Sequence, residues 1–79
     1  MPAKQPTKKQ RAALLAEYEA TMEANREGYM AYERAHLATR AGKLSTTEAE
    51  CIKAEHREAH RLYWRAYEKA RALRKADGA

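Results

Sequence analysis

The stretch that decides the fold is AGKLSTTE, residues 41–48, near the middle of a chain of 79 residues. Gly42 suits the left-handed conformation that commonly follows the last turn of a helix. Ser45 is followed three residues later by Glu48, a capping-box pattern that is typical of the start of a helix. The stretch therefore predicts one helix that ends near residue 41 and a second helix that begins near residue 46.

The residues before this turn indicate where the first helix begins. Thr7 and Gln10 form another capping-box pattern, and both prolines of the chain, Pro2 and Pro6, precede it. Few β-branched residues are present, and no segment has the pattern of a strand. The sequence predicts a flexible tail at residues 1–6, then a single helical domain at 7–79, with helices at about 7–41 and 46–76 and a turn at 42–45.

Two long helices joined by a short turn are expected to fold back on each other as an antiparallel hairpin. Apolar and aromatic residues recur in both helices at alternating spacings of three and four, which gives each helix one continuous seam. The fold class predicted from this pattern is all-α. The predicted facing pairs are Leu15 with Leu73, Tyr18 with Ala70, Met22 with Ala66, Asn25 with Tyr63, Tyr29 with Ala59, Tyr32 with His56, and His36 with Ile52.

Length, charge and cysteine content limit the classes of protein that fit. A chain of this length buries only a thin core, so small chains commonly gain stability from a second subunit. Cys51 is the only cysteine, and a lone thiol is typical of a cytoplasmic protein. No apolar run reaches the roughly 20 residues of a membrane span, and the first residues do not resemble a secretory signal. The net charge of +5 favours acidic partners.

A stripe of small residues on the first helix predicts self-association. Gly28 lies within this stripe, although glycine inside a helix costs about 1 kcal/mol relative to alanine, so a close approach of another helix is the interpretation. We expect a homodimer, with two hairpins forming a four-helix bundle; docking onto a foreign helix is the alternative, and alanine is also simply a good helix former. The expected interface comprises Leu14, Ala24, Gly28, Ala31, Ala35, Ala38 and Leu62.

An aromatic patch on the second helix is the expected site for a partner protein. Trp64 and Tyr67 lie outside the predicted seam, and interface energy is concentrated in Trp, Tyr and Arg. The same composition also suits base stacking beside a phosphate backbone, and the rings could instead cover the outside of the bundle. The arginines expected around the pair are Arg57, Arg61, Arg65 and Arg71.

Basic residues gather at the two ends of the chain, which an antiparallel hairpin brings together. Cations in the first turn of a helix are unfavourable, so those at the start of the first helix suggest a functional role. They favour nucleic-acid binding as the alternative function, although no helix-turn-helix or zinc-finger pattern is present. The candidate nucleic-acid contacts are Lys4, Lys8, Lys9, Arg11, Arg74 and Lys75.

The segment HREAH, residues 56–60, resembles a zinc-binding pattern, but Glu58 stands midway between its histidines. Known helical zinc motifs place the glutamate directly beside a histidine, so we expect no metal site here. A metal-binding bundle is the weakest alternative, with His36, His56 and His60 as its candidate ligands. The preferred interpretation has His56 hydrogen-bonded to Tyr32 or a neighbour, and His60 at the surface near Arg26. A pairing of Glu33 with Lys53 across the hairpin is also expected.

The sequence shows no constellation of residues that is typical of catalysis. It has three glycines, neither a glycine-rich phosphate loop nor a nucleophile elbow, and no long loop that could shape a pocket. We therefore expect a protein without enzymatic activity and without a cofactor. The leading hypothesis is a small cytoplasmic regulator or adaptor, of the kind that phages and mobile elements encode, which binds a host or partner protein.

Overall fold

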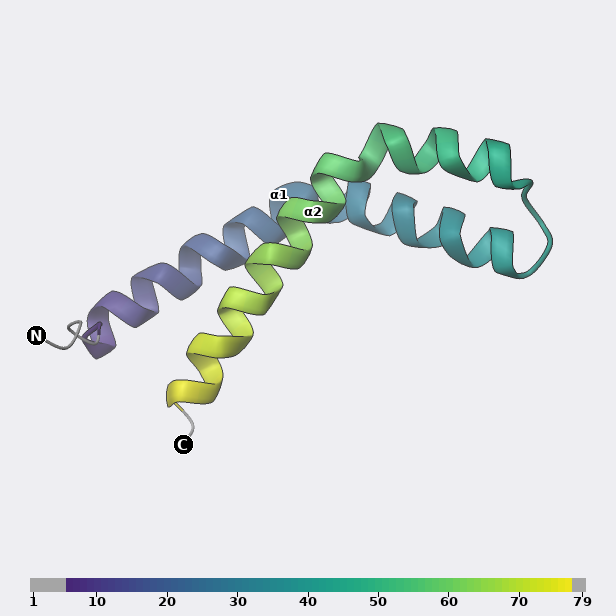
Figure 1. Ribbon diagram of the computed structural model, residues 1–79. Helices are drawn as coiled ribbons and strands as arrows, with labels where there is room; N and C mark the ends of the chain where they lie inside the picture. The colour runs from purple at the N-terminus through teal and green to yellow at the C-terminus, as the bar shows by residue number, and fades with distance from the viewer. Residues whose placement is uncertain (1–5, 78–79) are drawn as a thin grey trace, which may run out of the picture.

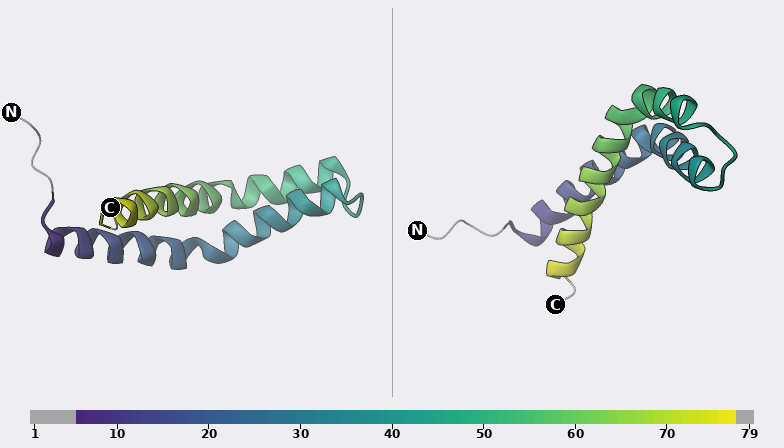
Figure 2. Two further views of the ribbon diagram at one scale, coloured as in Figure 1. Left: turned by 90° about the horizontal axis from the view of Figure 1, so that it is seen from below. Right: turned by 45° about the vertical axis from the view of Figure 1, so that its right-hand side comes forward.

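The computed structural model describes residues 6–77, so the predicted flexible tail lies outside the described residues except for Pro6. Helix α1 spans Lys8–Arg40 and helix α2 spans Thr46–Asp77. The two helices lie side by side and antiparallel, with the start of α1 and the end of α2 remote from the turn (Figures 1 and 2). No strand is present among residues 6–77. The predicted all-α helical hairpin is confirmed, and its helix limits agree with the prediction to within one residue.

The helix ends are fixed by the short-range contacts that the sequence predicts. At the start of α1, the Thr7 hydroxyl accepts a hydrogen bond from the Gln10 amide at 3.1 Å, and the Thr7 amide donates to the Gln10 side chain at 2.8 Å. At the start of α2, the Ser45 hydroxyl accepts from the Glu48 amide at 3.1 Å. Gly42 follows α1 with a φ of 73°, a left-handed conformation that glycine adopts without strain.

Small side chains make up the core of the hairpin. Only alanines are buried among the described residues: Ala35 at 4% exposed, Ala49 at 1%, Ala66 at 5% and Ala70 at 0%. No large side chain is fully buried there. Each alanine presents a single methyl group to the other helix, so the helices approach closely but remove little apolar surface from water. The isolated hairpin therefore has a thin core, as its length predicts.

In the view of Figure 1, α2 passes across α1 near the middle of the hairpin, and Gly28 makes a tight contact with α2. A β-carbon added to Gly28 would overlap the β-carbon of Ala59 and would lie 3.6 Å from Nδ1 of His56. Gly28 therefore faces α2 within the hairpin, and the prediction that it serves a second interface is wrong. The same correction applies to Ala35, which is already buried within the hairpin.

This close contact displaces the predicted layers. Gly28, and not Tyr29, stands opposite Ala59. A residue without a side chain fits at this contact, and the neighbouring Tyr29 ring stacks on His60 and Tyr63. At the open end of the hairpin, Leu15 and Leu73 line a common hollow, as expected for a facing pair.

Candidate functional site

A ladder of stacked rings joins the two helices beside the crossing point, and we call its members, Tyr32, His60, Tyr29 and Tyr63, the ring ladder. The His60 ring stacks on Tyr32 with a centroid separation of 3.9 Å and on Tyr29 with one of 5.1 Å. Tyr29 in turn stacks on Tyr63 at 4.0 Å. Stacked rings of this kind stabilise beyond the apolar area that they bury, so the ladder adds to a core made of alanines.

His60 is therefore not the surface residue near Arg26 that the sequence suggests. Its ring lies between two tyrosines, and its Nε2 is 2.8 Å from a carboxylate oxygen of Glu33, to which it donates. Burial, followed by the nearby charge of Glu33, raises the pKa of the Tyr29 hydroxyl above its ordinary value of 10.0. The ring ladder is thus an ordered contact between the helices. It engages both faces of the His60 ring in stacking and its Nε2 in the hydrogen bond to Glu33.

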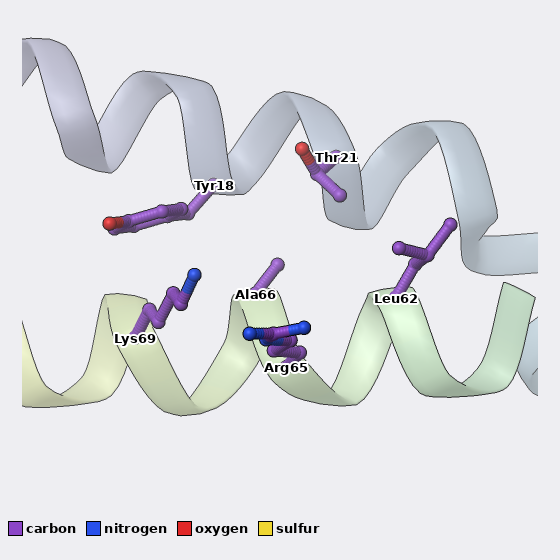
Figure 3. A pocket seen from close by; sticks show the side chains of 6 residues that line it. All are labelled: Tyr18, Thr21, Leu62, Arg65, Ala66 and Lys69. Carbon is purple, nitrogen blue, oxygen red and sulfur yellow. The ribbon is translucent and has the colours of Figure 1, made fainter.

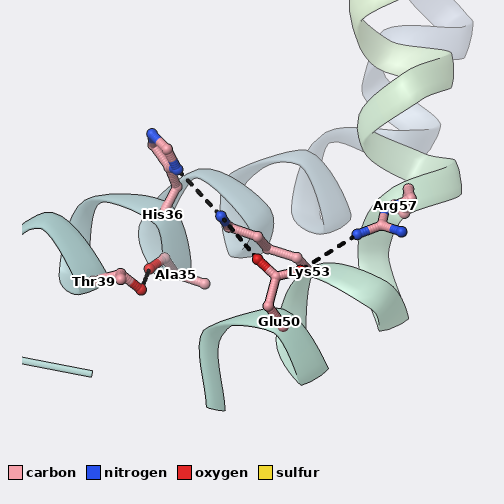
Figure 4. Close-up of polar contacts among 6 residues, drawn as sticks. All are labelled: Ala35, His36, Thr39, Glu50, Lys53 and Arg57. Atoms are coloured by element: carbon pink, nitrogen blue, oxygen red, sulfur yellow. Dashed lines mark hydrogen bonds and ion pairs between the residues drawn. The ribbon is translucent and has the colours of Figure 1, made fainter. Parts of the chain in front are cut away.

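The other two histidines also have places in the hairpin. Lys53 Nζ lies 3.2 Å from Nδ1 of His36 and 3.7 Å from the carboxylate of Glu50 (Figure 4). The predicted pairing of Lys53 with Glu33 is wrong. Glu33 is hydrogen-bonded to His60, and Lys53 is hydrogen-bonded to His36. His56 lies beside Gly28 at the crossing. The ring that stacks on Tyr32 belongs to His60, and among residues 6–77 no hydrogen bond joins His56 to that tyrosine.

The geometry does not favour a metal site. Across the described part of the chain, no three His, Cys, Asp or Glu groups are placed to hold one metal ion. The Nδ1 lone pair of His36 accepts a hydrogen bond from an ammonium group, and the ring of His60 is held between tyrosines. The candidate ligands His36, His56 and His60 therefore do not converge on one point.

An exposed aromatic pair, Trp64 and Tyr67, lies on the outer side of α2. The two rings are stacked with centroids 5.4 Å apart and an angle of 19° between their planes. Trp64 is 47% exposed and Tyr67 is 36% exposed. The indole is fixed by its neighbour and yet open to solvent, which is a costly arrangement for a side chain of this size in water.

The four predicted arginines are arranged unequally around this pair. Arg61 donates two hydrogen bonds to the carboxylate of Glu58, at 2.5 and 3.2 Å. These hydrogen bonds lower the pKa of the glutamate and raise the pKa of the arginine. Arg57 lies 3.7 Å from Glu50 (Figure 4), whereas Arg71 is exposed and has no hydrogen bond or ion pair among residues 6–77.

Arg65 does not belong to the aromatic pair. It stands two residues before Tyr67, which is about 200° around a helix. Its side chain lines a hollow on the opposite flank of the hairpin, together with Leu62 and Tyr18 (Figure 3). Leu62, predicted as part of a dimer interface, therefore shares a concave surface with a cation.

The basic open end is present in the structure. Lys8, Arg11 and Arg74 line one hollow there, with Leu73 in its floor. Arg74 also donates to the carboxylate of Glu19 at 2.7 Å, so part of its charge is neutralised within the hairpin. The exposed side chains of Lys9 and Lys75 lie at the same end, and Lys4 lies outside the described residues.

The rest of the small-residue stripe is divided by the fold. Leu14, Ala31 and Ala38 are half-buried, and Ala24 is exposed. Two large apolar side chains stand exposed on the same helix and were not predicted as interface residues, Met30 at 44% and Leu37 at 59%. Their spacing of seven residues, which keeps side chains on one face of a helix, is the signal in the sequence that could have identified them.

Comparison with known proteins gives no family for this chain. It matches no protein-family model, no curated protein and no solved structure. Within residues 6–77, neither helix has an apolar stretch long enough to cross a membrane. Cys51 is a free, exposed thiol.

Proposed function

We propose that this protein is a non-enzymatic interaction module that binds a partner protein through the aromatic pair Trp64 and Tyr67. The observation that carries the proposal is a stacked tryptophan and tyrosine that the hairpin leaves half exposed. Because the pair is already ordered, a partner that covers it loses little side-chain entropy on binding. Arg57 and Arg71 stand seven residues before and after Trp64, which places them on the same face of α2. Arg61 is paired with Glu58, whereas Arg71 has no ion pair among residues 6–77 and can pair with an acidic group of the partner.

A regulator or adaptor of this kind, acting in the cytoplasm, fits the remaining features. The exposed free thiol of Cys51 is stable in a reducing compartment. The thin alanine core leaves the hairpin with little stability of its own, and a partner that binds the folded state adds stability by mass action. Small adaptors encoded by phages and mobile elements are one class of protein with these properties.

The first prediction is that Trp64→Ala weakens partner binding by about 2 kcal/mol, or roughly 30-fold in Kd, because truncating a central aromatic anchor typically has this effect. The protein is used to capture its partner from extract of its native cell, treated or untreated with nuclease, and the Kd of the retained partner is then measured. Helicity should not change, since the indole lies outside the contact between the helices.

Arg34→Ala is the matched control, because it also truncates a large exposed side chain but lies on α1. It should leave the Kd unchanged. Equal binding by wild type and Trp64→Ala would refute the proposed surface. Loss of helicity in Trp64→Ala would show that the indole supports the fold and not a partner.

Nucleic-acid binding is the second candidate function, favoured by the hollow in which Lys8, Arg11 and Arg74 come together. The same capture experiment distinguishes it. Phosphate contacts release counterions, so affinity for nucleic acid falls steeply with salt. If nuclease removes the captured material and its binding falls steeply between low and physiological salt, this candidate replaces the first.

We also propose a homodimer that joins two hairpins in a four-helix bundle through the outer surface of α1. The exposure of Met30 and Leu37 supports it, with Ala24, Ala31 and Ala38 allowing close approach. Leu37→Glu should then convert a dimer into a monomer in sedimentation equilibrium, because the carboxylate would be buried at the interface. Ala13→Glu, a change at an exposed position far along α1, should leave the dimer intact. A wild-type protein that is monomeric at high micromolar concentration contradicts the proposal.

A further inference from the structure

A concave groove runs between the helices in the open half of the hairpin. It consists of two adjoining hollows of about 380 and 440 Å³ that share Tyr18 and Lys69. Figure 3 shows the first of them. Pro6 and Arg11 close its outer end, where an Arg11 nitrogen donates to the Pro6 carbonyl at 2.8 Å. The other residues that line it are Thr21, Leu62, Arg65, Ala66, Ala72, Leu73 and Ala76.

The groove combines an apolar floor with a rim of one charge. Tyr18, Leu62 and Leu73 provide most of the apolar surface, and alanine methyl groups lie between them. All the charged residues that line it are cations, namely Arg11, Arg65 and Lys69. Lys69 lies 5.7 Å from the centre of the Tyr18 ring, and among residues 6–77 Arg65 has no hydrogen bond or ion pair.

From this arrangement we infer that the groove binds an amphipathic helix of a partner protein, one with an apolar stripe flanked by acidic residues. Leu62, Arg65, Lys69, Leu73 and Ala76 follow one another along α2 at spacings of three and four, so they form a continuous strip on one face. The strip is about 21 Å long at 1.5 Å per residue, which accommodates roughly four turns of a partner helix.

The charges specify where the partner carries its acids. Arg65 and Lys69 are four residues apart, so their stems leave α2 one turn from each other. A helix packed along the groove would present carboxylates at the same spacing, four residues apart beside its apolar stripe. The small side chains Ala66, Ala72 and Ala76 permit the interaxial distance of about 8–10 Å at which helices pack.

Two other occupants fit this surface less well. In a symmetric dimer the same patch of both copies meets, which would bring Arg65 and Lys69 of each copy against those of the other. Nucleic acid supplies negative charge but no apolar stripe to cover Leu62 and Leu73. An acidic amphipathic helix would cover the apolar side chains of the floor and pair with the cations of the rim.

This inference goes beyond the function proposed above, because the groove lies on the flank opposite Tyr67 and recruits a different element of the partner. The two proposals can fail separately. Trp64→Ala should leave binding in the groove unchanged, whereas changes at Arg65 and Lys69 should leave the surroundings of the indole unchanged in fluorescence, since Trp64 is the only tryptophan.

The test uses the full chain and two synthetic helical peptides of about 18 residues, or five turns. Both carry the same leucine stripe; one has glutamates at a spacing of four beside it and the other has lysines there. We expect the wild type to bind the glutamate peptide at least about tenfold more tightly, by fluorescence anisotropy. Arg65→Glu with Lys69→Glu should reverse this preference, because the rim changes sign.

Arg40→Glu with Lys43→Glu is the matched control, since it changes the net charge equally at exposed positions near the turn of the hairpin, and it should keep the preference for the glutamate peptide. If the double charge reversal in the groove lowers helicity, Arg65→Gln with Lys69→Gln replaces it and should abolish the preference.

Three results would overturn the inference. The first is equal affinity of the wild type for the two peptides. The second is a control variant that reverses the preference as fully as the groove variant. The third is displacement of the glutamate peptide from the wild type by a single-stranded oligonucleotide whose own binding is abolished by the changes at Arg65 and Lys69. That result would assign the groove to nucleic acid.

Discussion

Replacing Gly28 with leucine should lower the free energy of unfolding by about 3 kcal/mol, although leucine is the better helix former. Even a β-carbon at this position overlaps the β-carbon of Ala59, so a longer side chain forces the helices apart at their crossing. Separation there also withdraws Tyr29 and Tyr63 from the ring ladder. The measurement is the midpoint of thermal or urea unfolding followed by circular dichroism.

Ala20→Leu, at an exposed position about two turns earlier on α1, should change the stability by no more than about 0.5 kcal/mol. A double-mutant cycle of Gly28→Ala and Ala59→Gly isolates the contact, because removing one methyl group makes room for the other. We expect the second change to restore part of the stability lost by the first. If Gly28→Leu and the wild type unfold at the same midpoint, the helices do not cross at this residue.

Ala70→Glu should be similarly destabilising, by about 3 kcal/mol or more at neutral pH, since it buries a charge without a partner. Ala70 is fully buried between the helices. The introduced carboxyl would have a raised pKa in the folded state because burial disfavours its charged form. The stability difference from wild type should therefore be smallest below the ordinary glutamate pKa and should grow as pH rises through the raised value.

Ala54→Glu provides the comparison, because Ala54 lies on the exposed side of the same helix and glutamate is a good helix former there. It should unfold at nearly the wild-type midpoint at every pH. A stability of Ala70→Glu that is close to wild type at neutral pH would show that the seam at the open end is hydrated, and that the alanine layer does not form a dry contact.

Prediction from sequence succeeded where contacts are local and was incomplete where two helices meet. Their positions relative to the seam predict an outer face for Trp64 and Tyr67, and both are half exposed. The sequence also predicts Arg65 beside them, because it is adjacent to Trp64 in the chain. Two residues along a helix turn a side chain by about 200°, so it lines a groove on the other flank.

The number of helices, their limits and their antiparallel arrangement can be predicted from the sequence alone. Those features follow from contacts within a few residues: Thr7 with Gln10, Ser45 with Glu48, and the left-handed Gly42. Such contacts form in the same way whatever the rest of the chain does.

Which faces meet along the seam depends on how the two helices cross. A straight helix drifts by about 20° per seven residues relative to a strict heptad pattern, so the line of contact moves around each helix as the two cross. That drift takes Gly28 from an apparent outer stripe into the closest contact with α2, and places His60 between two tyrosines. Side-chain spacing along one helix does not contain this information, because it depends on the angle and distance of the other helix.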